Sequence, residues 1–392
     1  MQKREVFIVG AKGIPARYGG FESFVEQLTV RKQTSLVHYY VACRRDLSKN
    51  KSDFYEYNNA TCFNVSVPNI GSAKAIMYDV RAFRRALKII EQKNIQHPIV
   101  YVLACRMGPF IGYFKHQLKK FDGELMVNPD GHEWLRAKWS VPVRKYWKIS
   151  EQLMVKHADL LICDSQNIEK YIRNDYARYH PQTRYIAYGS DIEKSQASLS
   201  DSKITRWYTK FNIEPDNYYL IVGRFVPENN YETMIKEFMS STTEKDLVII
   251  TNVEKNSFYD DLERNSHFLN DKRIKFVGTV YNNQTLKLIR EHAFAYIHGH
   301  EVGGTNPSLL EALGSTKVNL LLDVGFNHEV GMAGARYWTK HKGSLSSLIE
   351  STEKLNKSEI NHLGSLAKKR ILNQFDWSII IKKYENTFNG NE

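Results

Sequence analysis

The chain has few of the features that mark secreted, membrane-spanning or metal-binding proteins. Its 392 residues include only four cysteines, and these lack the paired spacing of a metal site. Buried free thiols are therefore expected at Cys43, Cys62, Cys105 and Cys163. No apolar run is long enough to cross a bilayer, and the first residues lead into a predicted strand and not into a signal peptide. We expect a cytoplasmic protein that needs no metal cofactor.

Acidic residues are fewer than basic ones. The chain has 43 Asp and Glu and 55 Lys and Arg, which gives a formal net charge of +12. This excess of positive charge predicts an acidic partner: a nucleic acid, an anionic membrane or a phosphorylated substrate. The sequence has no zinc-finger, RRM or helix-turn-helix pattern, so no nucleic acid partner is expected.

One segment, residues 131–148, gathers basic and aromatic residues around a single acid, Glu133. Side chains of these two kinds together suit the headgroup layer of an anionic bilayer. The segment predicts peripheral attachment to the inner leaflet, on the cytoplasmic face of the plasma membrane. The residues expected at this acceptor and membrane surface are Arg17, Trp134, Arg136, Lys138 and Trp139. The alternative interpretation is a solvated basic face over core tryptophans.

Short β-branched runs alternate with helical patterns along the whole chain, which predicts an α/β fold with parallel sheets and helices on both faces. The length exceeds one ordinary core, and the alternation restarts near residue 191. We expect two doubly wound, Rossmann-like domains facing each other across a cleft. Residues 1–190 would bind the acceptor and residues 191–375 a nucleotide sugar. Residues 376–392 form a C-terminal helix, for which packing back on the first domain is one option.

The strands of the first domain are expected at 6–9, 37–42, 63–67, 99–103, 125–127, 160–163 and 184–187. Those of the second are expected at 219–222, 247–251, 274–277, 294–298 and 318–322. The clearest helical patterns cover 21–30, 74–91, 143–157, 168–173, 231–239, 284–292, 307–314, 358–372 and 377–388.

A glycine-rich stretch at residues 303–306 runs directly into a predicted helix that begins at Pro307. A helix start offers unpaired N–H groups and a partial positive charge, which suits a diphosphate. A glutamate one turn inside the helix suits a ribose hydroxyl pair. The expected donor ligands here are Gly303, Gly304, Thr305, the N-cap Asn306, Ser308 and the ribose ligand Glu311. The plainer alternative is a tight Gly-Gly turn before a glutamate that the helix dipole favours.

In the first domain, two loops after predicted strands carry further candidates. The loop that follows the first strand ends in Gly19-Gly20, which lets a backbone approach a bulky ligand, and it offers Arg17 for phosphate charge. The loop after residue 127 carries Asp130 and His132, which suit orienting a sugar hydroxyl or handling a proton. For Asp130 alone, an ordinary Asp-Gly turn is the favoured interpretation.

In the second domain, Gly223 and Arg224 follow a predicted strand, and the fork of donors on Arg224 suits a diphosphate. Gly278 and Thr279 follow another strand, where backbone groups suit reading a nucleobase. Arg224 is the strongest single candidate for charge neutralisation of a leaving nucleoside diphosphate.

These motifs in this order resemble the retaining GT-B glycosyltransferases. Four segments are similar, more narrowly, to bacterial rhamnosyltransferases of capsule and cell-wall synthesis: GIPARYGGFE (13–22), NPDGHEWLRAKW (128–139), GRFVPENN (223–230) and GGTNP (303–307). The resemblance implies transfer of L-rhamnose from dTDP-L-rhamnose to a polyprenyl-diphosphate-linked sugar, with retention of the anomeric configuration. In that scheme Arg224 and the helix start stabilise the leaving group, while Asp130 and His132 orient the reacting sugars.

Two positions depart from the broader family pattern. Nine residues separate Glu301 from Glu311 where the family has seven, and Gly303 occupies the usual first position. Asn229 stands where the family has a lysine, so less positive charge is expected near the diphosphate. Glu301 remains a catalytic candidate and Asn229 a donor ligand.

Other functions are compatible with parts of the pattern. The same fold using a UDP-sugar such as UDP-glucose is the nearest alternative. An NAD-dependent sugar oxidoreductase or epimerase is another, although the loop after the first strand lacks G-x-G-x-x-G. A non-catalytic membrane-docking subunit is the third.

Overall fold

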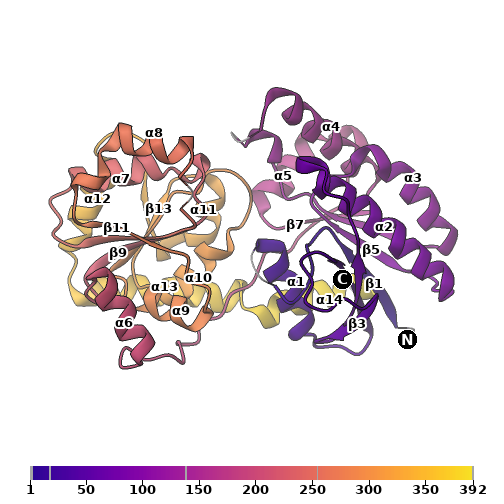
Figure 1. The fold of residues 1–392 in the computed structure, drawn as a ribbon, viewed down its shortest axis with the longest axis horizontal. Helices are drawn as coiled ribbons and strands as arrows, with labels where there is room; N and C mark the ends of the chain where they lie inside the picture. Colours follow the sequence, from indigo (N-terminus) through magenta and orange to yellow (C-terminus); the bar gives the residue numbers. More distant parts are fainter. Residues whose placement is uncertain (1–2, 17–18, 137–138, 254, 391–392) are drawn as a thin grey trace. The chain divides into compact units, whose positions relative to one another are not determined.

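The computed structural model describes residues 3–16, 19–136, 139–253 and 255–390, and the chain folds into two compact units (Figure 1). Unit 1 comprises Met1–Gly189 and Trp377–Glu392, and unit 2 comprises Ser190–Asp376. The last helix of the chain thus belongs to unit 1. None of the described helices has the length and apolar character of a membrane span.

In the described part of unit 1, eight strands form one sheet in the order β3-β4-β2-β1-β5-β6-β7-β8. All neighbours are parallel except β3 and β4. The order reverses between β1 and β5, and ligands of such sheets bind beyond the carboxyl ends of the strands at this switch point. The strands are β1 (Arg4–Val9), β2 (Val37–Arg44), β3 (Phe54–Tyr57), β4 (Ala60–Val65), β5 (Ile99–Leu103), β6 (Glu124–Asn128), β7 (Leu160–Cys163) and β8 (Thr183–Tyr185).

Helices cover both faces of this sheet because alternate strand residues point to opposite sides. One apolar core joins one face to α2 (Lys74–Gln92), α3 (Gly108–Leu118), α4 (Val141–His157) and α5 (Gln166–Asp175). The other face packs against α1 (Gly20–Val30) and α14 (Trp377–Asn389). There Tyr384 contacts both Phe24 and Tyr101 through its ring. The C-terminal helix therefore completes the core of unit 1 (Figure 1).

Six strands of the described unit 2 form a parallel sheet in the order β11-β10-β9-β12-β13-β14, which reverses between β9 and β12. The strands are β9 (Tyr218–Val222), β10 (Asp246–Ile250), β11 (Ile274–Gly278), β12 (Ala295–His298), β13 (Asn319–Leu322) and β14 (Arg336–Trp338). The helices are α6 (Ser202–Phe211), α7 (Tyr231–Ser240), α8 (Ser257–Ser266), α9 (Asn283–Glu291), α10 (Pro307–Ser315), α11 (Gly325–Gly331), α12 (Ser344–Glu353) and α13 (Lys357–Gln374). Short 3-10 helices are η1 (Gly71–Ala73), η2 (Lys119–Phe121), η3 (Glu133–Leu135), η4 (Ala177–Tyr179), η5 (Pro227–Asn229), η6 (Phe268–Asn270) and η7 (Met332–Gly334).

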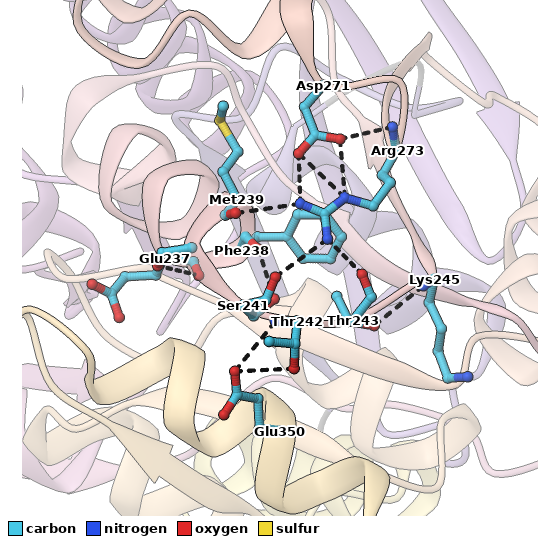
Figure 2. Close-up of polar contacts among 11 residues, drawn as sticks. Glu237, Phe238, Met239, Ser241, Thr242, Thr243, Lys245, Asp271, Arg273 and Glu350 are labelled. Atoms are coloured by element: carbon cyan, nitrogen blue, oxygen red, sulfur yellow. Dashed lines mark hydrogen bonds and ion pairs between the residues drawn. The ribbon is translucent and has the colours of Figure 1, made fainter.

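A polar clamp closes the amino-terminal edge of the sheet in unit 2 (Figure 2). The Arg273 guanidinium pairs with Asp271 at 2.6 Å and lowers the pKa of that carboxyl group. It also donates to the carbonyl oxygens of Met239, in the last turn of α7, and of Ser241 and Thr243, in the segment between α7 and β10. These groups precede β10 and β11, so they lie away from the carboxyl ends where ligands bind. Their role is to hold this segment.

The expected α/β class with two doubly wound sheets is confirmed, and every expected strand is present within a few residues. The four cysteines are all buried and free, as expected. Two strands, β3 and β14, were not anticipated. Both are edge strands of three or four residues, too short to show a clear apolar pattern.

Candidate functional site

The loop after β1 lies at the switch point of unit 1. Gly10 has φ = 108°, and a Cβ there would collide with the carbonyl oxygen of Leu103 at the end of β5. Only glycine combines this backbone conformation with so close an approach. The loop therefore crosses directly over the point where the strand order reverses.

Glu22 of α1 organises the rest of this loop. Its buried carboxylate accepts a hydrogen bond from the backbone N–H of Lys12 at 2.7 Å. Its second carboxylate oxygen lies where a side chain at Gly19 would begin, and Gly19 has φ = 128°. Gly20, by contrast, is exposed, and a Cβ at this position would have no atom within 4 Å. Gly20 is thus the position that leaves room for a ligand. Arg17 lies outside the described residues.

The loop that follows β6 holds three successive residues in the left-handed region: Asp130 (φ = 60°), Gly131 (φ = 86°) and His132 (φ = 52°). Such strain in non-glycine residues gathers at functional sites. The centre of the His132 ring lies 4.1 Å from that of Tyr171, with the two planes tilted by 36°, and burial lowers the pKa of His132. The imidazole is therefore neutral near pH 7, when it can accept as well as donate a hydrogen bond.

The basic and aromatic residues after His132 are mostly engaged inside unit 1. Arg136 is buried and paired with Glu133, whose carboxylate also accepts the indole N–H of Trp139 at 2.9 Å. Trp134 is half-buried, and the Lys148 ammonium lies 4.4 Å from the centre of its ring. Trp134, Arg136 and Trp139 thus have partners within unit 1, whereas Arg144 and Lys145 of the same segment are exposed. The expected membrane surface stays a prediction. Lys138 lies outside the described residues.

Arg106, which sequence reasoning did not select, also lies at the switch point of unit 1. Its Nε pairs with Asp79 of α2 at 2.6 Å, and its Nη2 donates to the carbonyl oxygens of Leu103 and Gly10. Asp79 is fully buried. One guanidinium therefore joins the ends of β1 and β5 to α2, directly below the glycine loop.

In unit 2, Arg224 comes two residues after β9. Its side chain is exposed, and no hydrogen bond or ion pair engages the guanidinium within the described part of the chain. Gly223, just before it, packs close to Asn229, because a Cβ at Gly223 would lie 3.3 Å from Nδ2 of Asn229. Arg224 is thus available to a ligand at the switch point.

The amide of Asn229 ties two loops of this edge together. Its Nδ2 donates to the carbonyl oxygen of Arg224 at 2.7 Å, and its Oδ1 lies 2.7 Å from Nδ1 of His300, in the loop after β12. Asn229 is also buried. Because the nitrogen and the oxygen of the amide both bond to protein groups, Asn229 holds the Arg224 loop in position.

Glu301 forms an ion pair with Lys340, a residue that the sequence analysis did not select. Its carboxylate pairs with Nζ of Lys340 at 2.5 Å and accepts from the Asn230 amide at 3.1 Å. Lys340 follows β14, a strand that was not anticipated. The parallel sheet thus brings a second positive charge to the edge where Arg224 lies.

The start of α10 has the expected geometry. The helix begins at Pro307, and the Asn306 side chain caps it by accepting from the N–H of Ser308 at 2.9 Å. Gly303 has φ = 121°, and Gly304 and Thr305 are buried beside it. The loop therefore brings backbone to the helix N-terminus with few side chains in the way.

Ser308 and Glu311 are held by groups beneath α10. The Ser308 hydroxyl donates to the carbonyl oxygen of Val222 at 3.2 Å and lies 3.2 Å from the Tyr296 hydroxyl. The buried guanidinium of Arg290 donates to Ser308 at 3.2 Å and pairs with Glu311 at 2.6 Å. Arg290 thus orients the half-exposed Glu311 carboxylate and joins α9 to α10, while Ser308 joins α10 to β9 and β12.

Gly278 and Thr279 lie at the end of β11, the outer strand of the sheet. Gly278 has φ = 77° and open space where a Cβ would be. The Thr279 hydroxyl is buried without a hydrogen-bond partner among the described residues. The position is open to a flat polar group.

His298, at the end of β12, makes the stability of unit 2 depend on pH. Complete burial lowers the pKa of His298 to about 3, so the residue is neutral in the folded state and takes up a proton on unfolding below pH 6.5. The stabilisation is complete above pH 6.5 and is lost as the pH falls toward 3, by about 1.4 kcal/mol per pH unit. Urea unfolding at several pH values measures this slope. His298→Asn should flatten it, and the same substitution at the exposed His341 should not.

A family model described as a domain of unknown function (DUF1972) matches residues 3–191. None of the curated proteins matches the chain at a significant level. Among solved structures, sucrose-phosphate synthase from Thermosynechococcus elongatus is similar, with a TM-score of 0.80 and 15% identity over 99% of both chains.

HepE from Anabaena, in complex with UDP, has a TM-score of 0.70 and 13% identity over 99% of this chain and 100% of its own. Trehalose 6-phosphate synthase from Burkholderia multivorans has a TM-score of 0.72 and 11% identity over 100% and 97%. The fold is GT-B. At identities of 15% or less, the likeness shows the GT-B fold alone.

Within the GT-B fold, each unit gathers its own share of the expected residues. Unit 1 brings Gly20, Asp130 and His132 to the carboxyl edge of its sheet, and unit 2 brings Arg224, Glu301 and the start of α10 to its own. Sequence reasoning missed Arg106, Lys340 and Arg290. Arg290 lies in the last turn of α9, where a basic residue is ordinary, so the sequence carried no signal that it is buried.

Proposed function

We propose that the chain is a retaining glycosyltransferase that uses a nucleotide-sugar donor. One observation carries the proposal. The exposed Arg224 follows β9, the glycine-rich N-terminus of α10 follows β12, and these two strands are neighbours at the switch point of the sheet. A guanidinium and unpaired backbone N–H groups together suit a diphosphate. The GT-B fold supports the assignment, and a solved structure of HepE, which has this fold, holds UDP and glucose.

In the proposed reaction the bond from the anomeric carbon to the donor phosphate oxygen breaks, and a bond to the acceptor hydroxyl oxygen forms on the same face. The acceptor proton passes to the departing phosphate oxygen, so the products are a glycosylated acceptor and a nucleoside diphosphate. Arg224 and the α10 N–H groups stabilise the charge that develops on the leaving group. Lys340 adds positive charge beside Glu301 at the same edge.

The remaining residues position the substrates. Glu311, oriented by Arg290, accepts hydrogen bonds from the ribose hydroxyls. Asp130 and the neutral His132 orient the reacting sugars from the loop after β6. The open space at Gly278 suits the nucleobase.

For the finer identity we propose L-rhamnose transfer from dTDP-L-rhamnose to a polyprenyl-diphosphate-linked sugar, without a metal ion. The support is the similarity of the four segments at 13–22, 128–139, 223–230 and 303–307 to bacterial rhamnosyltransferases. UDP-glucose is the competing donor, because trehalose-6-phosphate synthase from E. coli, a similar structure, was solved with UDP-2-fluoro glucose.

A nucleotide screen read by thermal shift separates these donors. A ligand at 100 times its Kd stabilises the native state by about 2.7 kcal/mol, so dTDP should raise the Tm by several degrees and UDP by less. Glu311→Ala should reduce the dTDP shift. A larger shift with UDP would reverse the donor assignment, and a shift with NADH alone would favour an oxidoreductase.

Turnover is then measured as dTDP release with dTDP-L-rhamnose and a polyprenyl-diphosphate-linked acceptor, with and without EDTA. Turnover that EDTA does not change is expected, because protein cations and helix N–H groups neutralise the leaving group. Absence of turnover with every nucleotide sugar would refute the proposed function.

A further inference from the structure

A groove with a volume of about 440 Å³ lies on the surface of unit 2, beside α13. One wall is a single face of this helix, because its lining residues recur at intervals of three or four: Asn361, Ser365, Lys368 and Leu372. The facing wall includes Lys317, in the loop between α10 and β13. The volume falls within the usual range for small-molecule sites.

The groove lies at the amino-terminal edge of the sheet, because Lys317 comes two residues before the first residue of β13. Arg224 and the start of α10 follow β9 and β12, at the carboxyl edge. Helix α10 connects the two edges, and α13 packs against it (Figure 1). A ligand in the groove therefore occupies a second site, separate from the one assigned to the donor.

Gly364 brings the two walls of the groove together. It is buried in the middle of α13, and a Cβ there would lie 3.1 Å from both Cα and Cβ of Lys317. Lys368 lies one turn further along the same face, where Cβ atoms four residues apart are about 5–6 Å from each other. The Cβ atoms of Lys317 and Lys368 are thus no more than about 9 Å apart. Both flexible ammonium groups can reach one anion.

The charge of the groove is positive. Three lysines line it, Lys317, Lys368 and Lys369, and none of the lining residues is Asp or Glu. No hydrogen bond or ion pair holds the three ammonium groups within the described chain. The acids nearest in sequence to a lining residue, Asp191 and Glu193, do not line the groove. Because like charges repel and a cleft lined by one sign concentrates the opposite sign, the groove favours an anion.

The remaining lining side chains suit a phosphate ester. Asn361 and Ser365 offer an amide N–H and a hydroxyl to phosphate oxygens, and Leu372, which is 47% exposed, adds apolar surface. We propose that the groove binds a small phosphate ester, with its phosphate between Lys317 and Lys368 and its apolar part against Leu372. The inference goes beyond the proposed transfer reaction, because none of these residues is assigned to the donor or the acceptor.

Lysine acetylation of the full chain, with and without phenyl phosphate and read by mass spectrometry, locates the site. Phenyl phosphate should protect Lys317 and Lys368, but not Lys357, an exposed lysine of α13 outside the groove. Phenol should protect none of the three, because it has no charge. Inorganic phosphate should protect Lys317 and Lys368 only at higher concentration, because it has no apolar part to bury. Added salt should weaken the protection.

Calorimetric titration with phenyl phosphate measures the affinity. Lys317→Gln/Lys368→Gln should weaken binding about tenfold or more, because two charge-assisted hydrogen bonds are lost. The matched control, Lys354→Gln/Lys357→Gln, removes the same charge from exposed positions of unit 2 and should bind as the wild type does. Leu372→Ser should lower the affinity for phenyl phosphate toward that for inorganic phosphate.

Equal affinity of Lys317→Gln/Lys368→Gln and the wild type would overturn the proposal, as would equal protection of Lys357. A lower Tm of the double variant with unchanged affinity would show that Lys317 only stabilises the C-terminal end of α10. Binding that persists in Arg224→Ala supports a site apart from the donor's. Binding that Arg224→Ala alone abolishes would place the probe in the donor site and refute the groove. The acetylation experiment uses the wild-type chain, so it decides the matter even where a variant fails to fold.

Discussion

Replacing Arg224 by alanine should lower kcat for transfer from the nucleotide sugar by about 100- to 1000-fold, the usual effect of removing one donor that stabilises transition-state charge. The side chain is exposed and unengaged in the described protein, so its loss leaves the fold intact. Arg224→Lys should recover part of the loss, because an ammonium keeps the charge but not the two-pronged geometry. Steady-state release of nucleoside diphosphate measures the effect.

The matched control for this experiment is Arg264→Ala, an exposed arginine on α8 whose partner Asp261 is also exposed. Its turnover should equal that of the wild type. If Arg224→Ala retained turnover within about threefold of the wild type, the diphosphate would bind elsewhere and the site in unit 2 would be wrong.

Replacing Arg106 by methionine should lower the free energy of unfolding by about 3–5 kcal/mol, because it leaves the buried Asp79 carboxylate without its charged partner. Burial raises the pKa of Asp79 even with Arg106 in place, so the orphaned carboxyl group must either take up a proton or remain charged in an apolar core. Urea unfolding at pH 7, followed by far-UV circular dichroism, measures the loss.

The double variant Asp79→Asn/Arg106→Met should recover part of this loss, because no charge then remains buried. The surface pair of Arg173 and Glu169 provides the control. Arg173 is 59% exposed, and Arg173→Met should cost about 1 kcal/mol or less. A cost below about 1 kcal/mol for Arg106→Met would show that Asp79 finds another partner or water.

Secondary structure in the centre of each sheet was readable from the chain because buried parallel strands are nearly continuous apolar runs. The segments at β5 and β7 match the prediction at both ends. The edge strands β3 and β14 were missed because few residues carry their pattern. Helix α3 was missed as well, since its sequence contains two glycines and three aromatic residues, which are poor helix formers.

The start of α10 was predicted to the residue because its signals are local. A proline at the first helical position and an asparagine cap act within one turn, and Asn306 and Pro307 do so here. The engagement of Asn229 was not predictable in the same way. Its partner His300 lies 71 residues further along the chain and comes into reach only through the folded sheet.

By itself the sequence determined the α/β alternation, the two sheets and the caps of helix α10, because each depends on residues within about one turn or one strand of each other. Only the tertiary structure decided which charges meet. Strands far apart in the chain end at the same edge of the sheet, and this brings Lys340 to Glu301. Arg290 meets Glu311 because helices α9 and α10 pack side by side. Pairings of this kind depend on strand order and register, which no local pattern encodes.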